Sequence, residues 1–367
     1  MLTGQNGILN RTAEAKEKTE AAQKDEEKTL QGYEDIIAQY TGSLPLREET
    51  KPYFPSSTFS YKEGDLSTGL VIKDSSDNEY VWVEVPRTDT VYPNAGINIT
   101  EFTDEEYTKI ESDLNEYTKD YKKNTDYRDV YYEDSTNGWY KNEAEYNMAK
   151  KKMLKSIYQN EGFWVGRYEA GIDGSDRDIS LALKENTTIS SPSTKAVSKK
   201  DMIPYNFVNC SQAQKLASKM STSSNKTSSL LFGIQWDLAC KFLEENSNLD
   251  QIDIKTDSYK WGNYANTEFK ITSTNAKQYI SSWQTIENFK KEKMSLLSTG
   301  ASEYTRILNI YDFAGNEWEW TLAHATIEAP NSDRGGSYRN NSEDCPVSHF
   351  SHYNKGCIEI GFRVTFY

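Results

Sequence analysis

The side chains with the widest chemical range in this sequence lie near its carboxyl end. Two of the three histidines, His349 and His352, and two of the four cysteines, Cys345 and Cys357, fall within residues 333–364. Imidazoles and thiolates are ligands for iron and copper, and soft thiolates suit Cu(I). Mixed with Tyr, Phe, Asn and Arg, they are also residue types that contact a binding partner. Metal chemistry and molecular recognition are therefore the two kinds of function to weigh.

The segment that carries these residues lacks the period of a helix or a strand. Its two ends, RGGS at residues 334–337 and IGFRV at residues 360–364, are typical of rigid turns. We therefore expect an irregular, outward-facing loop between two fixed ends. The residues expected to hold those ends are Arg334, Gly335, Gly336, Gly361, Phe362 and Arg363.

Strand and helix patterns elsewhere predict a mixed domain that positions this loop. Residues 70–73 and 80–85 are β-rich arms around a polar turn, which is typical of a hairpin. "GFWVGRYEAGI" predicts a further strand, whereas "NCSQAQKLASKM" and "LLFGIQWDLACKFLEEN" predict amphipathic helices. In "NIYDFAGNEWEWT", Gly315 and Asn316 indicate a turn, and Trp318 and Trp320 then alternate with glutamates, which predicts a half-buried strand.

Residues 101–160 predict an acidic, tyrosine-rich helical insertion in that domain. Thr103 and Glu106 form the pattern of a capping box. An apolar stripe at helical spacing follows, which favours packing over a binding role; it consists of Tyr107, Ile110, Leu114, Tyr117 and Tyr121.

Charge and composition narrow the classes of partner. The net charge of -14 would repel a nucleic-acid backbone or an anionic membrane surface, so we expect no nucleic-acid partner. The sequence contains no stretch of about 18 apolar residues, so it predicts no membrane-spanning helix. Four cysteines permit three pairings but do not identify the cellular compartment.

The amino-terminal residues are strong helix formers with supportive charge pairs at four-residue spacing. An apolar stripe appears only in the last turns, ahead of Gly42 and Pro45, which predicts a solvated helical stalk over residues 1–42. This stretch resembles the segment after the membrane helix in pilin-like leaders of Gram-positive bacteria. That resemblance implies a removed leader or membrane anchor upstream and an extracellular position on a bacterial surface. An ordinary cytosolic helix is the alternative.

Five strings occur in a characteristic order: "PYNFVNCSQAQKLA", "LLFGIQWDLACKF", "NIYDFAGNEWEWT", RGGS and IGFRV. Together they resemble the formylglycine-generating-enzyme (sulfatase-modifying factor) domain, which is a variant of the C-type lectin fold. The resemblance implies an α+β fold over residues 43–367, with the 101–160 insertion outside the shared core.

In that family, the stretch matching "NIYDFAGNEWEWT" binds calcium through hard oxygen ligands. The resemblance therefore nominates the carboxylates of Asp312 and Glu319 and the carbonyls of Gly315 and Glu317 for a structural calcium ion. The alternative is that Asp312 and Glu319 cap the turn. No other cofactor is expected.

The oxidising members of the family bind copper through two cysteines just after RGGS, and a second branch binds iron through histidines. Here Cys345 stands alone in that window, with Cys357 twelve residues further on, and the histidines are only His324, His349 and His352. The catalytic pair is therefore not matched. A copper- or iron-dependent oxidase of protein thiols or small sulfur compounds stays the alternative function, and a pilus-like structural subunit is a third.

The same fold occurs in the variable proteins of diversity-generating retroelements, where adenine-directed mutagenesis rewrites this segment, typically at AAY codons. Such codons cannot give Lys, Glu, Gln, Met or Trp. Within residues 338–359 only Glu343, Lys355 and Glu359 lie outside the reachable set, although Lys and Glu are abundant elsewhere. The resemblance implies a non-catalytic receptor or adhesin for a protein or glycan on another cell, a host or a phage. The expected contact residues are Tyr338, Arg339, Asn341, Asp344, Cys345, His349, Phe350, His352, Tyr353 and Ile358.

Overall fold

The computed structural model describes residues 52–121, 129–131, 139–174, 194–220, 227–286, 288–325, 330–353 and 355–367. These residues belong to the second of two units into which the chain divides, residues 49–367. The sequence placed the boundary at residue 42, and the stalk predicted for residues 1–42 lies outside the described residues.

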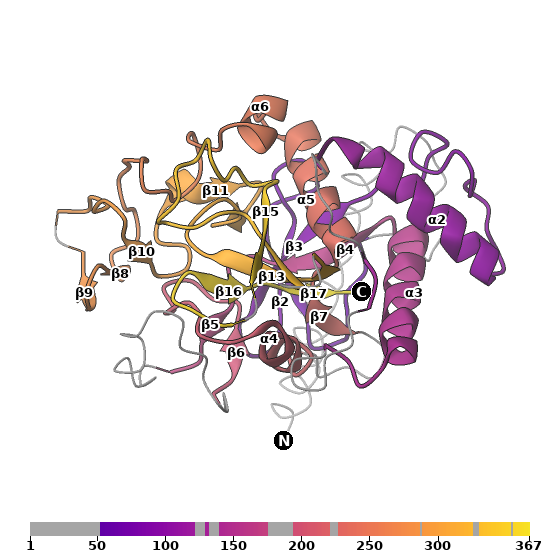
Figure 1. The fold of residues 1–367 in the computed structure, drawn as a ribbon, viewed down its shortest axis with the longest axis horizontal. Helices are drawn as coiled ribbons and strands as arrows, with labels where there is room; N and C mark the ends of the chain where they lie inside the picture. Colours follow the sequence, from indigo (N-terminus) through magenta and orange to yellow (C-terminus); the bar gives the residue numbers. More distant parts are fainter. Residues whose placement is uncertain are drawn as a thin grey trace, which may run out of the picture. The chain divides into compact units, whose positions relative to one another are not determined.

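Helices and strands are mixed along the chain, which confirms the α+β class (Figure 1). Within the described ranges, every helix falls short of the length and hydropathy that spanning a bilayer requires. The α-helices are α2 (Asp104–Tyr117), α3 (Glu143–Asn160), α4 (Cys210–Ala217), α5 (Gly233–Asn246) and α6 (Gln251–Lys255), and the 3-10 helices are η1 (Lys119–Tyr121) and η3 (Glu303–Thr305).

A six-stranded antiparallel sheet in the order β1-β2-β3-β4-β17-β7 forms the base of the domain. The predicted hairpin is confirmed as β2 and β3, and its valines and aromatic residues are buried. The carboxyl-terminal strand β17 lies between β4 and β7, which ties the chain's end into the sheet. The strands are β1 (Ser60–Glu63), β2 (Val71–Lys73), β3 (Glu79–Glu84), β4 (Gly162–Gly166), β7 (Ser228–Leu230) and β17 (Val364–Phe366).

A second sheet of four strands, in the order β15-β14-β13-β16, positions the carboxyl-terminal segment. Its strands are β13 (Trp318–His324), β14 (Asn331–Arg334), β15 (Phe350–Tyr353) and β16 (Ile360–Phe362). The prediction of a half-buried β13 is wrong, because all but its last residue are buried. Helices α4 and α5 both pack against this strand, and the Trp320 indole donates to the Val208 carbonyl at 2.8 Å.

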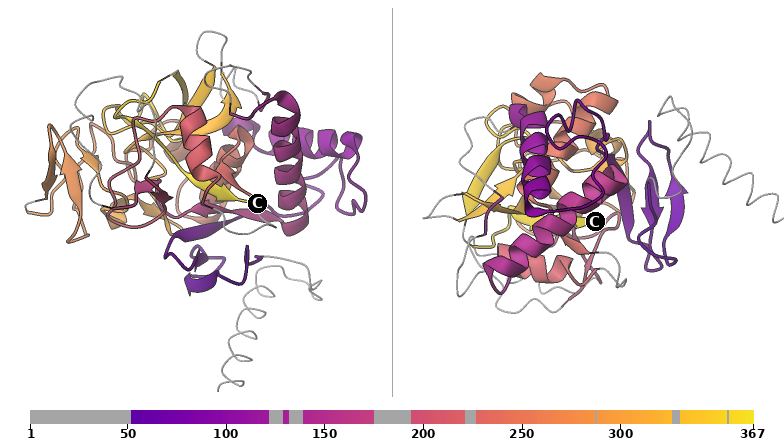
Figure 2. Two further views of the ribbon diagram at one scale, coloured as in Figure 1. Left: turned by 90° about the horizontal axis from the view of Figure 1, so that it is seen from below. Right: turned by 90° about the vertical axis from the view of Figure 1, so that its right-hand side faces the viewer.

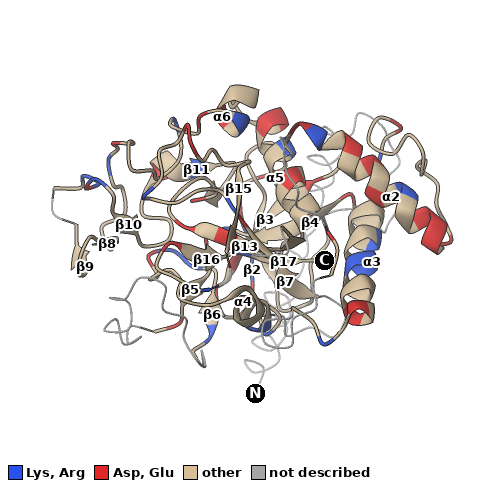
Figure 3. Ribbon diagram, in the orientation of Figure 1, with Lys and Arg blue, Asp and Glu red and all other residues tan. Residues whose placement is uncertain are grey.

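Helices α2 and α3 form the described part of the predicted insertion and pack against each other (Figure 2). The Thr103 hydroxyl caps α2 by accepting the Glu106 amide, and Asn142 caps α3 in the same way. Of the predicted stripe, Ile110, Leu114 and Tyr121 are buried, as expected for packing. Acidic residues gather along α2 (Figure 3), which agrees with the acidic character predicted for this region.

Helix α5 begins at Gly233, later than the sequence pattern predicted. Residues Ser228–Leu230 instead pair with β17, because the sheet takes up their backbone groups before the helix starts. The remaining strands form small sheets around the domain: β5 (Gly171–Ile172) with β6 (Ala196–Val197), β8 (Lys277–Tyr279) with β9 (Trp283–Thr285) and β10 (Leu296–Leu297), and β11 (Arg306–Ile307) with β12 (Ile310–Tyr311).

Candidate ligand-binding site

The carboxyl-terminal segment is fixed at its first end by a buried arginine. Arg334 ends β14, and its guanidinium donates to Asp237 of α5 at 2.6 Å and to the Ser348 carbonyl at 3.1 Å. Both charged side chains are 0% exposed. Gly336 follows with a φ of 78°, and a β-carbon there would lie 2.5 Å from the Cys345 carbonyl oxygen, so the turn requires glycine.

A second buried arginine, Arg363, fixes the other end and joins the two sheets, since it lies between β16 and β17. Its guanidinium donates to the Glu319 carboxylate at 2.7 Å and to the carbonyls of Gly166 and Tyr311, each at 2.9 Å. Each arginine makes charge-assisted bonds in a low-dielectric interior, which are the stronger kind. The expectation that the arginines and glycines of the two motifs hold the ends is consistent with these contacts.

Between these ends, the 338–359 segment is held largely through its own main chain. The Val347 carbonyl accepts the Trp236 indole N–H at 3.1 Å, and the Ile358 carbonyl accepts the Asn206 amide at 3.0 Å. Further main-chain groups of the segment bond to the surrounding domain: the Tyr338 amide to Asn316, the Asn340 carbonyl to Ala265, the Val347 amide to Ser258, the Ser348 amide to Ile254 and the Cys357 carbonyl to Phe207. These bonds do not depend on which side chain the segment carries at each position.

Most of the ten predicted contact residues reach the surface. Four are exposed, namely Asn341, Asp344, His349 and His352, and four are half-buried, namely Arg339, Cys345, Phe350 and Tyr353. The expectation that all ten face outward is wrong for Tyr338 and Ile358, which are 2% and 5% exposed. Both pack with Phe207, Tyr279 and Leu296, so their side chains close an apolar cluster beneath the segment.

The segment also contains a strand that its sequence did not indicate. Residues 350–353 form β15, which pairs antiparallel with β14 at the edge of the sheet. Since side chains alternate along a strand, Tyr353 lies on one face of the sheet and Phe350 and His352 lie on the other. The structure therefore divides the predicted contact residues between two faces. The ring centre of His349 lies 6.2 Å from that of Phe350. Although His349 is exposed, partial desolvation of its imidazole lowers its pKa, and Arg334 adds to this shift.

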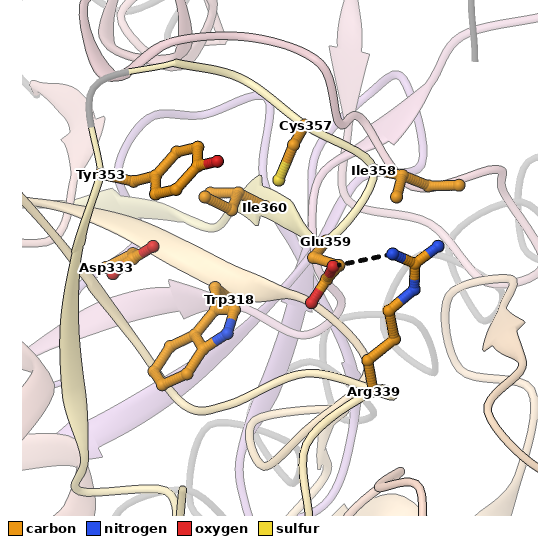
Figure 4. A pocket seen from close by; sticks show the side chains of 8 residues that line it. All are labelled: Trp318, Asp333, Arg339, Tyr353, Cys357, Ile358, Glu359 and Ile360. Carbon is orange, nitrogen blue, oxygen red and sulfur yellow. Dashed lines mark hydrogen bonds and ion pairs between the residues drawn. The ribbon is translucent and has the colours of Figure 1, made fainter. Parts of the chain in front are cut away.

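One face of the four-stranded sheet is hollowed into a pocket of about 280 Å³ (Figure 4). We call it the Asp333 pocket. Three predicted contact residues line it: Arg339, Tyr353 and Ile358. The other lining residues, which sequence reasoning did not nominate, are Trp318, Asp333, Cys357, Glu359 and Ile360.

Asp333 is the most unusual residue of this pocket. It lies in the middle of β14 and is 1% exposed, yet its Oδ1 atom has no hydrogen-bond partner among the described residues. Burial raises the pKa of Asp333 to about 8, and the nearby Glu359 adds to the shift. Its only sequence signal was its place directly before RGGS, which does not distinguish a buried aspartate from an exposed one.

Glu359 and Arg339 form an ion pair at the same pocket. The Arg339 Nη1 atom lies 3.1 Å from Glu359 Oε1, and the Ser337 hydroxyl donates to the other carboxylate oxygen at 3.1 Å. Figure 4 shows this pair across the pocket from Asp333 and Tyr353. The one guanidinium among the lining residues is therefore already engaged by a carboxylate.

The model of the sulfatase-modifying factor enzyme 1-like domain, FGE-sulfatase, matches residues 55–366. This chain belongs to that family. The match confirms the formylglycine-generating-enzyme-like fold that the ordered sequence motifs predicted. No curated protein matches the sequence significantly.

Two solved structures are similar over part of the chain. Treponema denticola variable protein 1 shares 14% identity, with a TM-score of 0.28, over 56% of this chain and 95% of that protein. CarF shares 16% identity, with a TM-score of 0.34, over 64% of this chain and 94% of that protein. At these scores neither similarity bears on function.

The stretch that carries calcium in the sulfatase-modifying factor family has other partners here. The two carboxylate oxygens of Asp312 accept the Thr305 hydroxyl at 2.7 Å and the Gly300 amide at 2.6 Å. The Glu319 carboxylate faces Arg363, and Gly315 and Glu317 lie buried beside these acids. Among the described residues, no three Asp, Glu, His or Cys side chains are arranged to hold a metal. As arranged, the nominated set does not fit a calcium ion, and the contacts of Asp312 are those of a turn cap.

The two thiols of the segment differ in exposure: Cys345 is half-buried and Cys357 is buried. Burial raises the pKa of Cys345 to about 11 and that of Cys357 to about 12. All four cysteines are free thiols. His324 lies at the end of β13, whereas His349 and His352 are exposed on the segment, so the histidines come from different places in the sheet.

Proposed function

We propose that this member of the family is a non-catalytic binding protein whose 338–359 segment contacts the partner. The observation that carries the proposal is the way in which the segment is held. Its carbonyl and amide groups bond to the domain, as at Val347 and Ile358, while most of its predicted contact side chains reach solvent. A segment mounted by its main chain can change its side chains without losing its position.

The composition of the segment supports a diversified site of the retroelement kind. Apart from Glu343, Lys355 and Glu359, its residues are those that mutated AAY codons can encode. Tyr, Arg and His on a rigid support provide rings and charges at low entropic cost, as in antibody paratopes. We therefore propose a receptor or adhesin, displayed on a bacterial surface through an amino-terminal anchor, that binds a protein or glycan on another cell, a host or a phage.

A binding screen with matched variants tests the assignment of the site. The purified chain would be applied to an array of cell-surface proteins and glycans. In one variant, Asn341, Asp344, His349, His352 and Tyr353 are replaced by serine; in the control, Lys73, Asp77, Glu105 and Lys119, which form exposed ion pairs elsewhere, are replaced. We expect the first variant to lose the bound partner and the control to retain it. Equal binding by both variants would refute the site.

The genomic neighbourhood tests the mode of diversification separately. A reverse transcriptase gene beside a near-copy of this gene's 3′ end, differing mainly where the copy has adenine, is the expected arrangement. We further expect the differences to fall at exposed positions such as Asn341 and His352. Differences concentrated at the buried Tyr338 and Val347 would contradict a main-chain-mounted segment, because those side chains fill the core.

The oxidase alternative predicts stoichiometric copper or iron and oxygen consumption with thiol substrates. We expect the purified chain, reconstituted with Cu(I) or Fe(II), to bind substoichiometric metal and to consume no oxygen above a Cys345→Ser, Cys357→Ser control. The reason is that the described residues contain no group of three Asp, Glu, His or Cys side chains arranged to hold a metal, and burial disfavours the thiolate at both cysteines. Stoichiometric metal with oxygen uptake that the control lacks would favour the enzyme.

A further inference from the structure

We propose that the Asp333 pocket binds a positively charged side chain of a protein partner, a lysine or an arginine. The inference rests on the proposed function, because it specifies the chemistry of one contact within the proposed site. It also favours a protein over a neutral glycan as the partner.

The Asp333 carboxylate lacks a partner for one of its two oxygens within the described part of the chain. Its Oδ1 atom is buried in the wall of the pocket and receives no hydrogen bond from the described residues. A buried polar atom without a partner is costly, and a buried carboxylate more so. An ammonium or guanidinium group entering the pocket would supply both a charge and N–H donors. Burial and Glu359 raise the pKa of Asp333, as expected for an acid that lacks its counter-ion.

The remaining lining residues suit a cation and not an anion. Trp318 and Tyr353 bring aromatic rings to the pocket, and ring faces attract ammonium and guanidinium groups. Ile358 and Ile360 provide apolar surface for the methylene groups of a long side chain. Arg339, the cation among the lining residues, lies 3.1 Å from Glu359 and is therefore engaged by that carboxylate.

Size points to a side chain as the occupant. The volume of about 280 Å³ lies just below the ~300–1,000 Å³ typical of small-molecule sites. It can accept one extended side chain from a partner whose other residues lie over the 338–359 segment. The chain's net charge of -14 also favours approach of a basic surface.

The pocket is lined by residues inside the segment that we propose is diversified in sequence and by residues outside it. Asp333, Trp318 and Ile360 lie outside the 338–359 segment, on β13, β14 and β16, whereas Arg339, Tyr353 and Ile358 lie within it. Substitution within the segment would reshape the pocket and leave the Asp333 carboxylate in place. A diversified segment would thus select among partners while the preference for a basic side chain persists.

Small cations can test this inference without a known partner. We would titrate the ¹⁵N-labelled chain with n-butylammonium and methylguanidinium, and with n-butanol as the neutral analogue of similar length. The Trp318 indole N–H, assigned through Trp318→Phe, reports on the pocket. We expect both cations to shift this resonance saturably and butanol not to do so. Equal effects of butanol and butylammonium would overturn the proposal, since they would indicate an apolar pocket.

Two aspartate variants test whether Asp333 supplies the negative charge that binds the cation. Asp333→Asn keeps the shape of the side chain and should weaken butylammonium binding at least ~10-fold, since it removes a charge-assisted bond. Asp201→Asn is the matched control: Asp201 Oδ1 is also buried without a partner, but it lies outside the pocket, and its φ of 62° suits asparagine. Binding that survives Asp333→Asn, or is lost equally in the control, would overturn the assignment.

The pH dependence of the unmodified protein gives an independent result if Asp333→Asn fails to fold. Butylammonium stays charged below pH ~10, and only ionised Asp333 attracts it fully. With a pKa of about 8, its affinity should be roughly a hundredfold lower at pH 6 than at pH 9. A flat profile would overturn the proposal.

Other titratable groups lie near Asp333 and differ from it in their pKa values. Burial raises the pKa of Cys345 to about 11 and of Cys357 to about 12, and it raises that of Cys210 well above its usual range, so these thiols stay neutral. His349, whose ring lies 5.9 Å from Trp318, has a pKa lowered by desolvation of the imidazole and by Arg334, which favours its neutral form. Glu359 and Arg339 face Asp333 as an ion pair, and Tyr353 completes the group.

The two proposals can fail separately. If the cations bind through Asp333 but the serine variant of the segment keeps its array partner, the pocket proposal holds and the binding function of the segment fails. If the serine variant loses its partner while no cation binds, the function holds and the inference about the pocket is wrong.

Discussion

The two faces of the four-stranded sheet differ in how their buried charged side chains are paired. On one face, Glu319 accepts hydrogen bonds from Arg363, and Arg334 pairs with Asp237 at 2.6 Å. On the other face, Asp333 lines a pocket and its Oδ1 has no hydrogen-bond partner among the described residues. The three sheet residues are neighbours: Glu319 pairs across the strands with Arg334, and Trp320 pairs with Asp333.

This difference separates structural from functional charge. Because side chains alternate along a strand, consecutive residues such as Asp333 and Arg334 enter two different environments. On the face that carries Glu319 and Arg334, these two side chains are paired with Arg363 and Asp237, so these two pairs serve stability. On the Asp333 face, by contrast, our proposal has the buried carboxylate compensated by a cation of the partner.

Removing a charge from the compensated face should have the largest effect. Arg363→Met would leave the Glu319 carboxylate and the carbonyls of Gly166 and Tyr311 buried without their donor. We expect a loss of about 3–5 kcal/mol in the free energy of unfolding, because a broken buried pair leaves an uncompensated charge. Chemical denaturation monitored by tryptophan fluorescence measures this loss.

An exposed arginine provides the matched control for that variant. Arg306 pairs with Glu303, and both side chains are more than 40% exposed. Arg306→Met should cost less than about 1 kcal/mol, because water screens such pairs. If Arg363→Met and Arg306→Met cost the same, the charges of this face do not stabilise the fold.

Removal of the Asp333 charge, on the pocket face of the sheet, should stabilise the protein, whereas removal of the Arg363 charge destabilises it. Because the folded pKa of Asp333 is about 8 and an unfolded aspartate titrates near ~3.9, the unfolded state loses its proton first as pH rises. Asp333 therefore costs stability increasingly between these two values. Asp333→Asn should raise the free energy of unfolding by about 1–3 kcal/mol at pH 8 and by less at pH 5, as measured by urea denaturation.

Asp237→Asn is the matched control for Asp333→Asn. Asp237 is as deeply buried as Asp333 but faces Arg334, so its replacement should lower the free energy of unfolding at both pH values. A gain in stability for Asp237→Asn, or a loss for Asp333→Asn at pH 8, would show that the two faces do not differ as proposed.

Patterns that depend on local chemistry could be predicted from the sequence. The β2–β3 hairpin, the cap at Thr103 and helix α4 follow from short-range preferences. The family was predictable from five ordered strings. The turn at the start of the segment was predictable as well. Glycine adopts a positive φ more readily than other residues, and Gly336 has such a φ.

Features that depend on tertiary pairing could not be predicted in this way. Residues 350–353 become a strand because β14 offers its edge, although FSHY has no strand period. Tyr338 is typical of a contact residue but is drawn into a cluster with Phe207 and Leu296. Asp333 belongs to a site only because the strands place it beside Trp318 and Tyr353, which are distant in sequence.

Calcium should have the smallest effect. The sequence nominated Asp312, Gly315, Glu317 and Glu319 as ligands, but Asp312 already accepts bonds from Thr305 and Gly300, and Glu319 accepts those of Arg363. A calcium ion would have to displace these donors, and breaking the buried Arg363–Glu319 pair costs about 3–5 kcal/mol. We expect the same melting temperature in excess calcium and in EDTA. A calcium-dependent rise that Asp312→Asn abolishes would instead place the family's ion at this turn and would make Arg363 one of several cations on that face.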